Sequence, residues 1–229
     1  MQIKVFTLFP DIFPGFLQYS LTGRAMHEGK WSLDTVNIRD YALDKYGSVD
    51  DTPCGGGAGM IMRADVLGRA IKAEYKGGRI IYMSPRGKPL TQSKVRELSK
   101  EDTLTIVCGR FEGIDERVLE AFSIEEISIG DYILTGGEQA ALILLDSVIR
   151  VLPGVLGNQA SLENESFEHL LLEHPQYTRP IDWEGHKVPE VLLSGHHQNI
   201  ADWQLEQSIK ITKARRPDLY QKYLDSKKV

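Results

Sequence analysis

Cysteine is scarce in this sequence, and long apolar runs are missing. Two cysteines, Cys54 and Cys108, occur in 229 residues, so a framework of disulfides is excluded and a reducing compartment is indicated. No apolar run approaches the roughly 18 residues that a membrane span needs. The first residues, MQIKVFTLFPDIF, have the pattern of a β-strand and lack the charged region and the apolar region of a secretion signal. We therefore expect a cytoplasmic protein with no membrane partner.

Two common nucleotide-binding motifs are also absent. The chain has no G-x-x-x-x-G-K-[ST] sequence, and the GGGAGM segment at 55–60 does not fit G-x-G-x-x-G, because Met62 stands where the last glycine is required. A Walker-type site and an ordinary dinucleotide site are therefore excluded. Excess positive charge is missing as well, since the formal net charge is −5. Any surface for nucleic acid must be a local patch.

What the chain has is an alternation of strand-like and helix-like segments. Runs rich in β-branched and aromatic residues predict strands over 3–9, 31–38, 79–84, 103–109 and 126–134. Apolar residues at helical spacing predict helices over 63–75 and about 137–151, and two further helices have Thr91 and Asp115 as candidate N-caps. This alternation predicts an α/β domain with a largely parallel sheet.

The character of the sequence changes after Pro153 and Gly154, which end the last long helix of this pattern. Residues 158–168 are polar and carry no strand pattern, and the chain from there to Val229 is mainly helical. We therefore expect an α/β domain over 1–156, a linker over 157–170 and a small helical domain over 171–229.

Three of the predicted strands end in glycine-bearing loops, which are SPRGK at 84–88, CGRFEGID at 108–115 and SIGDYILTGGE at 128–138. The carboxyl ends of parallel strands meet at one sheet edge, where main-chain N–H groups face outward and ligands bind. Glycine lets the main chain approach a ligand without a Cβ, which suits recognition of an adenine edge by main-chain hydrogen bonds. One such loop is more often a tight turn, but three at one sheet edge indicate a binding site.

Several motifs resemble those of one enzyme family. They are DDTPCGGGAGM, SPRGKPL, CGRFEGIDERV, SIGDYILTGGE, HPQYTRP and VPEVLLSGHH, and they extend along nearly the whole chain. Together they resemble the bacterial tRNA (guanine-N1)-methyltransferases, the TrmD family. The resemblance implies a SPOUT-type parallel sheet with a deep trefoil knot, a homodimer, S-adenosylmethionine as cofactor, and methyl transfer to N1 of the guanosine immediately 3′ of the tRNA anticodon. Alternation of strands and helices alone predicts an open, unknotted sheet.

The resemblance also implies which residues hold the cofactor. The bare main chain of the third loop is expected to wrap the adenosine, and the helix that follows is expected to anchor this loop and to pack on the partner subunit. Simple core packing is the alternative for the apolar residues of that helix. The residues expected to bind the cofactor are Met83, Gly109, Phe111, Glu112, Gly113, Ile129, Gly130, Asp131, Tyr132, Ile133, Leu134, Gly136 and Gly137.

Two side chains are expected to carry the chemistry. N1 of guanine bears a proton at neutral pH, so a positioned base contributes on the order of 10²- to 10⁴-fold, and removal of the proton moves negative charge onto O6. The resemblance implies that Arg150 stabilises this charge. It also implies Glu165 as the base, where the family typically has aspartate. Glu112 and Asp131 are the alternative candidates for the base.

Contacts with RNA are expected from two segments. The resemblance implies that the glycine loop closes over the flipped target base with Gly55, Gly56, Gly57 and Gly59, although Cys54 and Ala58 replace the family's common tyrosine and proline. In KITKARRPDLYQKY, at 210–223, cations interleaved with tyrosines indicate phosphate binding. A solvated helix face is the alternative. The residues expected to contact the RNA backbone are Arg179, Lys213, Arg215 and Arg216.

Two other functions stay open as alternatives. One is a knotted methyltransferase that acts on a ribose 2′-hydroxyl, and the other is a protein of the same fold that binds RNA without catalysis. Family activity is associated with Mg²⁺, but no carboxylate cluster in the sequence identifies a site for it. The adjacent His196 and His197 would point to opposite faces of an extended segment, which disfavours a shared metal ion.

Overall fold

The computed structural model describes residues 1–157 and 165–228. Contacts between Cα atoms divide the chain into two compact units, Met1–Gly157 and Asn158–Val229. Within the described residues, no helix combines the length and the apolar character needed to cross a membrane. Cys54 is exposed, Cys108 is buried, and both are free thiols.

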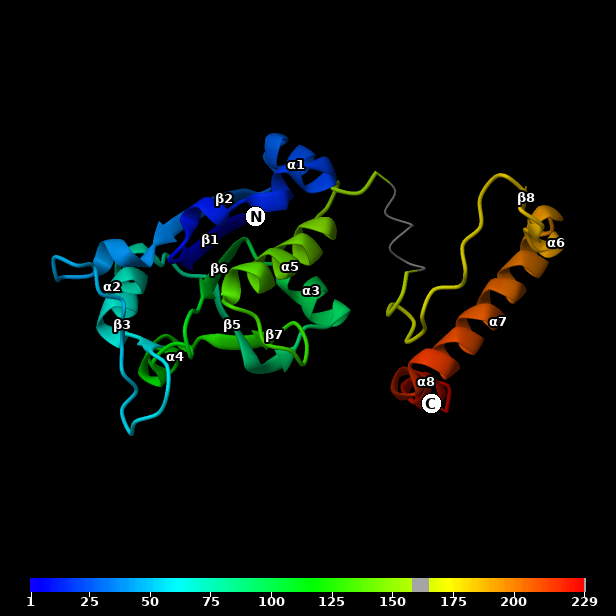
Figure 1. Ribbon diagram of the computed structural model, residues 1–229. Helices are drawn as coiled ribbons and strands as arrows, with labels where there is room; N and C mark the ends of the chain where they lie inside the picture. Colours follow the sequence, from blue (N-terminus) through cyan, green and yellow to red (C-terminus); the bar gives the residue numbers. More distant parts are fainter. Residues whose placement is uncertain (158–164, 229) are drawn as a thin grey trace. The chain divides into compact units, whose positions relative to one another are not determined.

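A five-stranded parallel sheet forms the centre of the first unit (Figure 1). Its strand order is β2-β1-β6-β5-β7. The strands are β1 (Gln2–Thr7), β2 (Ser32–Asn37), β5 (Arg79–Pro89), β6 (Thr103–Cys108) and β7 (Glu125–Ser128). The predicted α/β class and the predicted parallel sheet are therefore confirmed.

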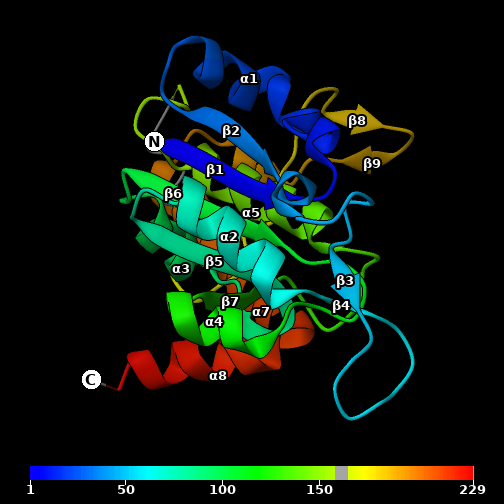
Figure 2. The ribbon, with the colours of Figure 1, turned by 90° about the vertical axis from the view of Figure 1, so that its left-hand side faces the viewer.

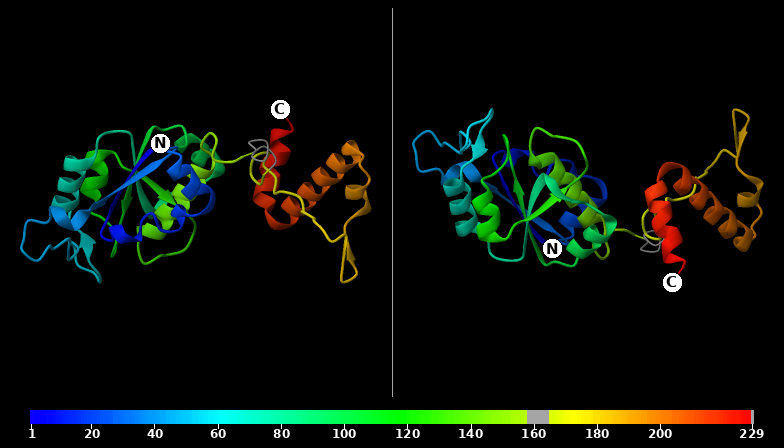
Figure 3. Two further views of the ribbon diagram at one scale, coloured as in Figure 1. Left: turned by 90° about the horizontal axis from the view of Figure 1, so that it is seen from above. Right: turned by 90° about the horizontal axis from the view of Figure 1, so that it is seen from below.

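Helices cover both faces of this sheet (Figures 2 and 3). One face carries α1 (Ser20–His27), α3 (Gln92–Leu98) and α5 (Gly137–Arg150), and the other carries α2 (Ala64–Glu74) and α4 (Glu116–Phe122). Successive residues of β5 alternate between the two cores, since Ile81 and Met83 belong to the first and Ile80 and Tyr82 to the second. Burial on both faces explains why these strands are nearly continuous apolar runs in the sequence.

The helix starts follow the predicted capping. The Thr91 hydroxyl accepts the Lys94 N–H at 3.2 Å ahead of α3. The Asp115 carboxylate accepts the Arg117 N–H at 3.0 Å ahead of α4. Both N-caps satisfy main-chain donors that a helix leaves unpaired at its first turn. The remaining elements of this unit are the single-turn helices η1 (Pro10–Ile12), η2 (Gly15–Gln18) and η3 (Ile38–Tyr41) and the strand pair β3 (Asp50–Asp51) and β4 (Ile61–Met62).

Two strand ends lie far from their predicted positions. The strand predicted over 126–134 ends at Ser128, because the Ser128 hydroxyl bonds both the N–H and the carbonyl of Gly130 and turns the chain out of the sheet. The strand predicted to end at 84 continues to Pro89. Met83 pairs with Ile127, residues 84–87 leave the sheet, and Lys88 then pairs with Ile127 again. This detour forms a loop inside a strand.

The second unit is mainly helical, as predicted, with α6 (Glu190–Leu193), α7 (His197–Arg215) and α8 (Pro217–Ser226). It also contains a hairpin of β8 (Asp182–Trp183) and β9 (His186–Lys187) that the sequence pattern did not predict. Its two-residue turn has positive φ at Glu184 and Gly185. A strand pair this short leaves no alternating pattern to detect.

Candidate functional site

The three glycine-bearing loops enclose one pocket at the carboxyl ends of β5, β6 and β7. The expected cofactor residues that line it are Met83, Gly109, Phe111, Glu112, Gly113, Ile129, Gly130, Tyr132, Ile133, Leu134, Gly136 and Gly137. Asp131 is exposed and does not line the pocket. Sequence reasoning missed Tyr82, Ile127 and Ala140, and it did not single out Ser84, Pro85, Arg110 and Ser128 within the loops that it predicted. Of these, Ala140 was detectable, since it follows Gly137 by one helical turn.

Main chain forms much of the wall between β7 and α5. Gly130 has φ +147°, a conformation that favours glycine. The N–H groups of Ile133 and Leu134 have no hydrogen-bond partner among the residues that the structure describes. Both residues are exposed, so these donors are available to a ligand.

Two glycines are required by close packing beneath the pocket. A Cβ on Gly109 would lie 2.7 Å from two atoms of the Tyr82 ring system, Cε2 and Oη. A Cβ on Gly137 would lie 2.9 Å from the Cα of Cys108. The first turn of α5 thus approaches the end of β6 more closely than any side chain would permit, and the Gly137 N–H donates to the Gly109 carbonyl at 2.9 Å.

Burial keeps two weak acids of this region neutral. Burial raises the pKa of the Tyr82 phenol, and the nearby Glu126 charge adds to the shift. Burial also raises the pKa of the Cys108 thiol well above its ordinary value, again reinforced by a carboxylate, Glu138. Neither group is therefore a base or a nucleophile near neutral pH.

The glycine loop between β3 and β4 is attached to the same pocket. Its end is fixed by two hydrogen bonds, from the Glu112 N–H to the Met60 carbonyl and from the Met62 N–H to the Gly113 carbonyl, each 2.9 Å long. A Cβ on Gly59 would overlap the Glu112 side chain. The expected RNA-contacting residues Gly55, Gly56 and Gly57 have positive φ and open space around them.

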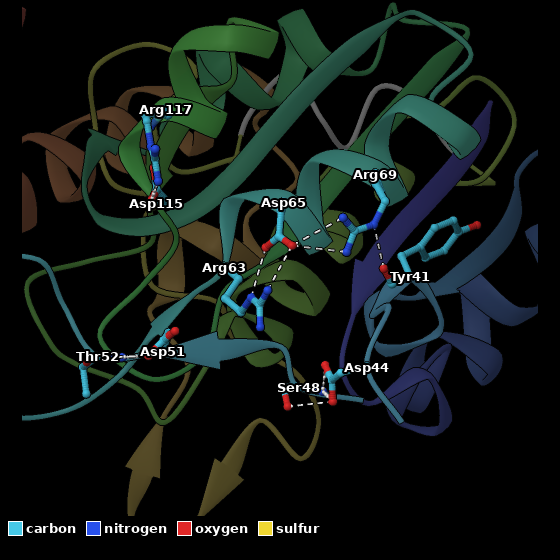
Figure 4. Close-up of polar contacts among 10 residues, drawn as sticks. All are labelled: Tyr41, Asp44, Ser48, Asp51, Thr52, Arg63, Asp65, Arg69, Asp115 and Arg117. Carbon is cyan, nitrogen blue, oxygen red and sulfur yellow. Dashed lines mark hydrogen bonds and ion pairs between the residues drawn. The ribbon is translucent and has the colours of Figure 1, made fainter. Parts of the chain in front are cut away.

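Ion pairs fasten the segments around this loop, as Figure 4 shows. Arg63 and Arg69 converge on the Asp65 carboxylate, with nitrogen–oxygen distances of 3.0 and 3.3 Å. Arg69 also donates to the Tyr41 carbonyl at 2.9 Å. The guanidinium of Arg63 lowers the pKa of Asp65. These contacts therefore hold the start of α2, which follows the loop, against the segment that contains Tyr41.

Arg150 and Glu165 do not line this pocket. Arg150 is the last residue of α5, and its charge counteracts the burial that raises the pKa of Asp146 one turn earlier. Glu165 belongs to the second unit, where it lines a hollow between residues 165–176 and the helices α7 and α8. Within the first unit, Arg150 therefore lies at the opposite end of α5 from the pocket residues Gly137 and Ala140.

The segment that carries Glu165 is tied to α7. The Leu172 N–H donates to the hydroxyl of Thr212 at 2.8 Å, and the Glu173 N–H donates to the hydroxyl of Ser166 at 3.0 Å. Thr212 is fully buried in α7. These bonds close residues 166–173 into a loop built on the helix.

Most of the expected phosphate-binding side chains are accessible. Arg179, Lys213 and Arg215 are exposed. Arg216 instead pairs with Asp218 through two short contacts of 2.8 and 2.6 Å, which hold the pKa of Asp218 at about 2. Its guanidinium already has a counter-charge, so phosphate would have to displace it. In the described part of the chain, no cluster of three His, Cys, Asp or Glu side chains could hold a metal ion.

Comparison with known proteins identifies the family. The family model described as tRNA (Guanine-1)-methyltransferase TrmD matches residues 1–222. Proteins called tRNA (guanine-N(1)-)-methyltransferase from Bartonella tribocorum, Brucella ovis and Rhizobium etli are 60%, 57% and 56% identical to the chain. The matches cover 97%, 98% and 96% of this chain and 96%, 93% and 96% of the relatives. The resemblance found in the sequence motifs is thereby confirmed, and the chain belongs to the TrmD family of tRNA (guanine-1)-methyltransferases.

Proposed function

We propose that this protein transfers the methyl group of S-adenosylmethionine to N1 of the guanosine immediately 3′ of the tRNA anticodon. The observation that carries the proposal is the single pocket made by three glycine-bearing loops, in a chain about 60% identical to a protein called a guanine-N1 methyltransferase. That name favours a base nitrogen over a ribose hydroxyl as the acceptor.

The pocket suits an adenosine-containing methyl donor. Apolar side chains such as Ile133 and Leu134 can cover an adenine ring, and their N–H groups, which have no partner among the described residues, can bind its edge. Glycines at 109 and 137 keep the floor open where a Cβ would collide with neighbouring atoms. When bound, the cofactor supplies an electrophilic methyl group on its sulfonium sulfur. Glu112, between the pocket and the glycine loop, can balance the sulfonium charge.

The chain's own side chains then have two tasks. Glu165 takes the proton from guanine N1, which makes that nitrogen a nucleophile. Arg150 donates to O6 and stabilises the negative charge that develops there. Both neutral acids near the pocket, Tyr82 and Cys108, are unsuited to the first task, since their pKa values are raised.

A homodimer is part of the proposal, because helix length separates the parts of the site. The 14 residues of α5 span about 20 Å, with pocket residues in the first turn and Arg150 at the end. In the proposed dimer, a second copy supplies the catalytic side chains to the pocket. Exposed apolar residues gather on η2, α1, α5 and the adjoining loop, where a second copy would cover them. They are Phe9, Phe16, Tyr19, Leu21 and Ile143.

Three further features come from family membership. We propose that the sheet carries the SPOUT-type deep trefoil knot, that residues 171–229 form the tRNA-binding domain with 157–170 as the linker, and that Mg²⁺ assists the reaction. The exposed Arg179, Lys213 and Arg215 support the second of these. Part of the linker lies outside the described residues. Light scattering on the purified protein tests the dimer directly.

The function is tested by transfer of labelled methyl from S-adenosylmethionine to tRNA transcripts. Transcripts with guanosine 3′ of the anticodon should be methylated at N1, and matched transcripts with adenosine there should not. In single-turnover experiments, Glu165→Gln should slow transfer by about 10²-fold. A loss of less than about fivefold would remove Glu165 as the base. Methylation at a ribose 2′-hydroxyl, or no cofactor binding by calorimetry, would contradict the proposed function itself.

A further inference from the structure

A buried charge pair lies directly behind the pocket. Glu138, in the first turn of α5, has a side chain that is only 2% exposed, and its Oε2 lies 3.0 Å from Nε of Arg110. Arg110 follows β6 and lines the pocket, whereas Glu138 does not. Burying a charge is costly unless it is paired and hydrogen-bonded. The pair therefore needs an explanation.

The contacts of the pair join three separate segments. The other oxygen of Glu138 accepts a hydrogen bond from the Thr7 hydroxyl at the end of β1, at 2.9 Å. Arg110 donates through Nη1 to the Thr135 carbonyl at 3.3 Å, and its guanidinium lies 4.3 Å from the centre of the Phe9 ring. The pair thus connects the ends of β1 and β6 with residues 129–136, which we call the cofactor loop.

The cofactor loop also rests on the arginine. A Cβ at Gly136 would lie 2.4 to 2.7 Å from Arg110 Nε, Cδ and Cζ, so its bare main chain packs against the guanidinium. Although the charged atoms are 3.0 Å apart, neither Arg110 Nε nor Glu138 Oε2 has an aligned hydrogen bond among the described residues. The arginine is held by charge, and its directed hydrogen bond goes to the loop.

We propose that Arg110 and Glu138 are a positioning pair that holds the cofactor loop in the conformation that binds the methyl donor. This inference rests on the proposed function. Among the described residues, and apart from bonds within α5, the loop's other hydrogen bonds are local, within residues 128–132. Without the Glu138 charge, the free energy of the Arg110 side chain is lower when the guanidinium turns toward water. Thr135 then loses its hydrogen bond to Arg110, and Gly136 loses its packing contact.

Calorimetric titration of S-adenosylmethionine into the full-length protein tests the pair. Glu138→Gln keeps the shape but removes the charge, and Arg110→Lys keeps the charge but cannot reach both Glu138 and Thr135. Each should weaken cofactor binding by about tenfold or more, while the affinity for tRNA changes less than about threefold. Loss of affinity in Glu138→Gln reports positioning, because Glu138 does not line the pocket.

A matched control separates positioning from general destabilisation. Ile71→Ala removes a fully buried side chain of α2 that is outside the pocket. It should lower the melting temperature and leave cofactor affinity unchanged. Equal weakening in this control, or pair variants that bind within about threefold of wild type, would overturn the inference while the proposed function stands.

Two outcomes remain to be separated. If wild type itself binds no S-adenosylmethionine, the proposed function falls, and the positioning role falls with it. If Glu138→Gln does not fold, Arg110→Lys and Thr7→Val take its place, and cofactor binding within about threefold of wild type in both would overturn the inference. Thr7→Val removes the hydrogen bond to Glu138 at nearly constant volume, so it should weaken cofactor binding by about threefold to tenfold.

Discussion

Gly109→Ala is the sharpest test of how packing makes the pocket. The new methyl group would lie 2.7 Å from Cε2 and Oη of Tyr82, a side chain that is only 7% exposed and belongs to the core under α2 and α4. The ring packs in that core on one side and lines the pocket on the other, so either the ring or the main chain after β6 must shift. Overpacking of this kind costs about 1–3 kcal/mol. For a chain of this length, that lowers the melting temperature by about 2–4 °C per kcal/mol.

The effect on the cofactor should exceed the effect on stability. Gly109 and Tyr82 both line the pocket, so the shift changes its shape, and we expect binding at least about tenfold weaker by calorimetry, or about 1.4 kcal/mol. Gly68→Ala is the matched control, because a Cβ there meets nothing within 4 Å in the middle of α2. It should stabilise the protein by up to about 1 kcal/mol. A Gly109→Ala protein that melts and binds like wild type would refute the packing argument.

Three other predictions concern the second unit and pH. Replacing Lys213 and Arg215 together by alanine should weaken binding of different tRNAs to the same extent. The slope of log binding constant against log salt concentration should become smaller in magnitude by about 2, and an unchanged slope would exclude both residues from phosphate contact. Thr212→Val should slow single-turnover methylation with cofactor affinity unchanged, because it removes the acceptor of the Leu172 N–H, and Thr212→Ser should restore the rate; equal rates for both variants would contradict this. Because the pKa of Asp65 is lowered in the folded protein, its stabilisation is present above about pH 4 and is lost as pH falls further. Thermal melts of Asp65→Asn should therefore differ from wild type at pH 7, by less than about 1 kcal/mol at this half-exposed site, and converge near pH 2.

Much of the fold could be predicted because local signals agree with the tertiary structure. The strands that end near Thr7 and Cys108 are buried on both faces, and such strands are visible as apolar runs. Thr91 and Asp115 act as caps through contacts two or three residues away, which a sequence displays directly. The end of β7 was predicted too late, because the apolar residues Tyr132, Ile133 and Leu134 are exposed and line a pocket instead of a core.

The site was less predictable, and the reason is physical. Glycine patterns show where the main chain carries no Cβ, so the three loops were found. No local sequence pattern indicates that Arg110 and Thr7 both contact Glu138. Arg110 and Glu138 are separated by 28 positions in the sequence, and Thr7 and Glu138 are separated by 131.

The detour within β5 limits how the family's pocket can vary. Residues 84–87 leave the sheet and return to the same β7 residue, Ile127, and Gly87 passes so close that a Cβ would lie 2.4 Å from the Ile127 nitrogen. Since both ends of the detour pair with one residue of β7, a deletion there would pull Lys88 and Pro89 out of their register with Ile127 and Ser128. Diversification of this wall should therefore occur by exchange of side chains at Ser84 and Pro85, with the number of residues held constant.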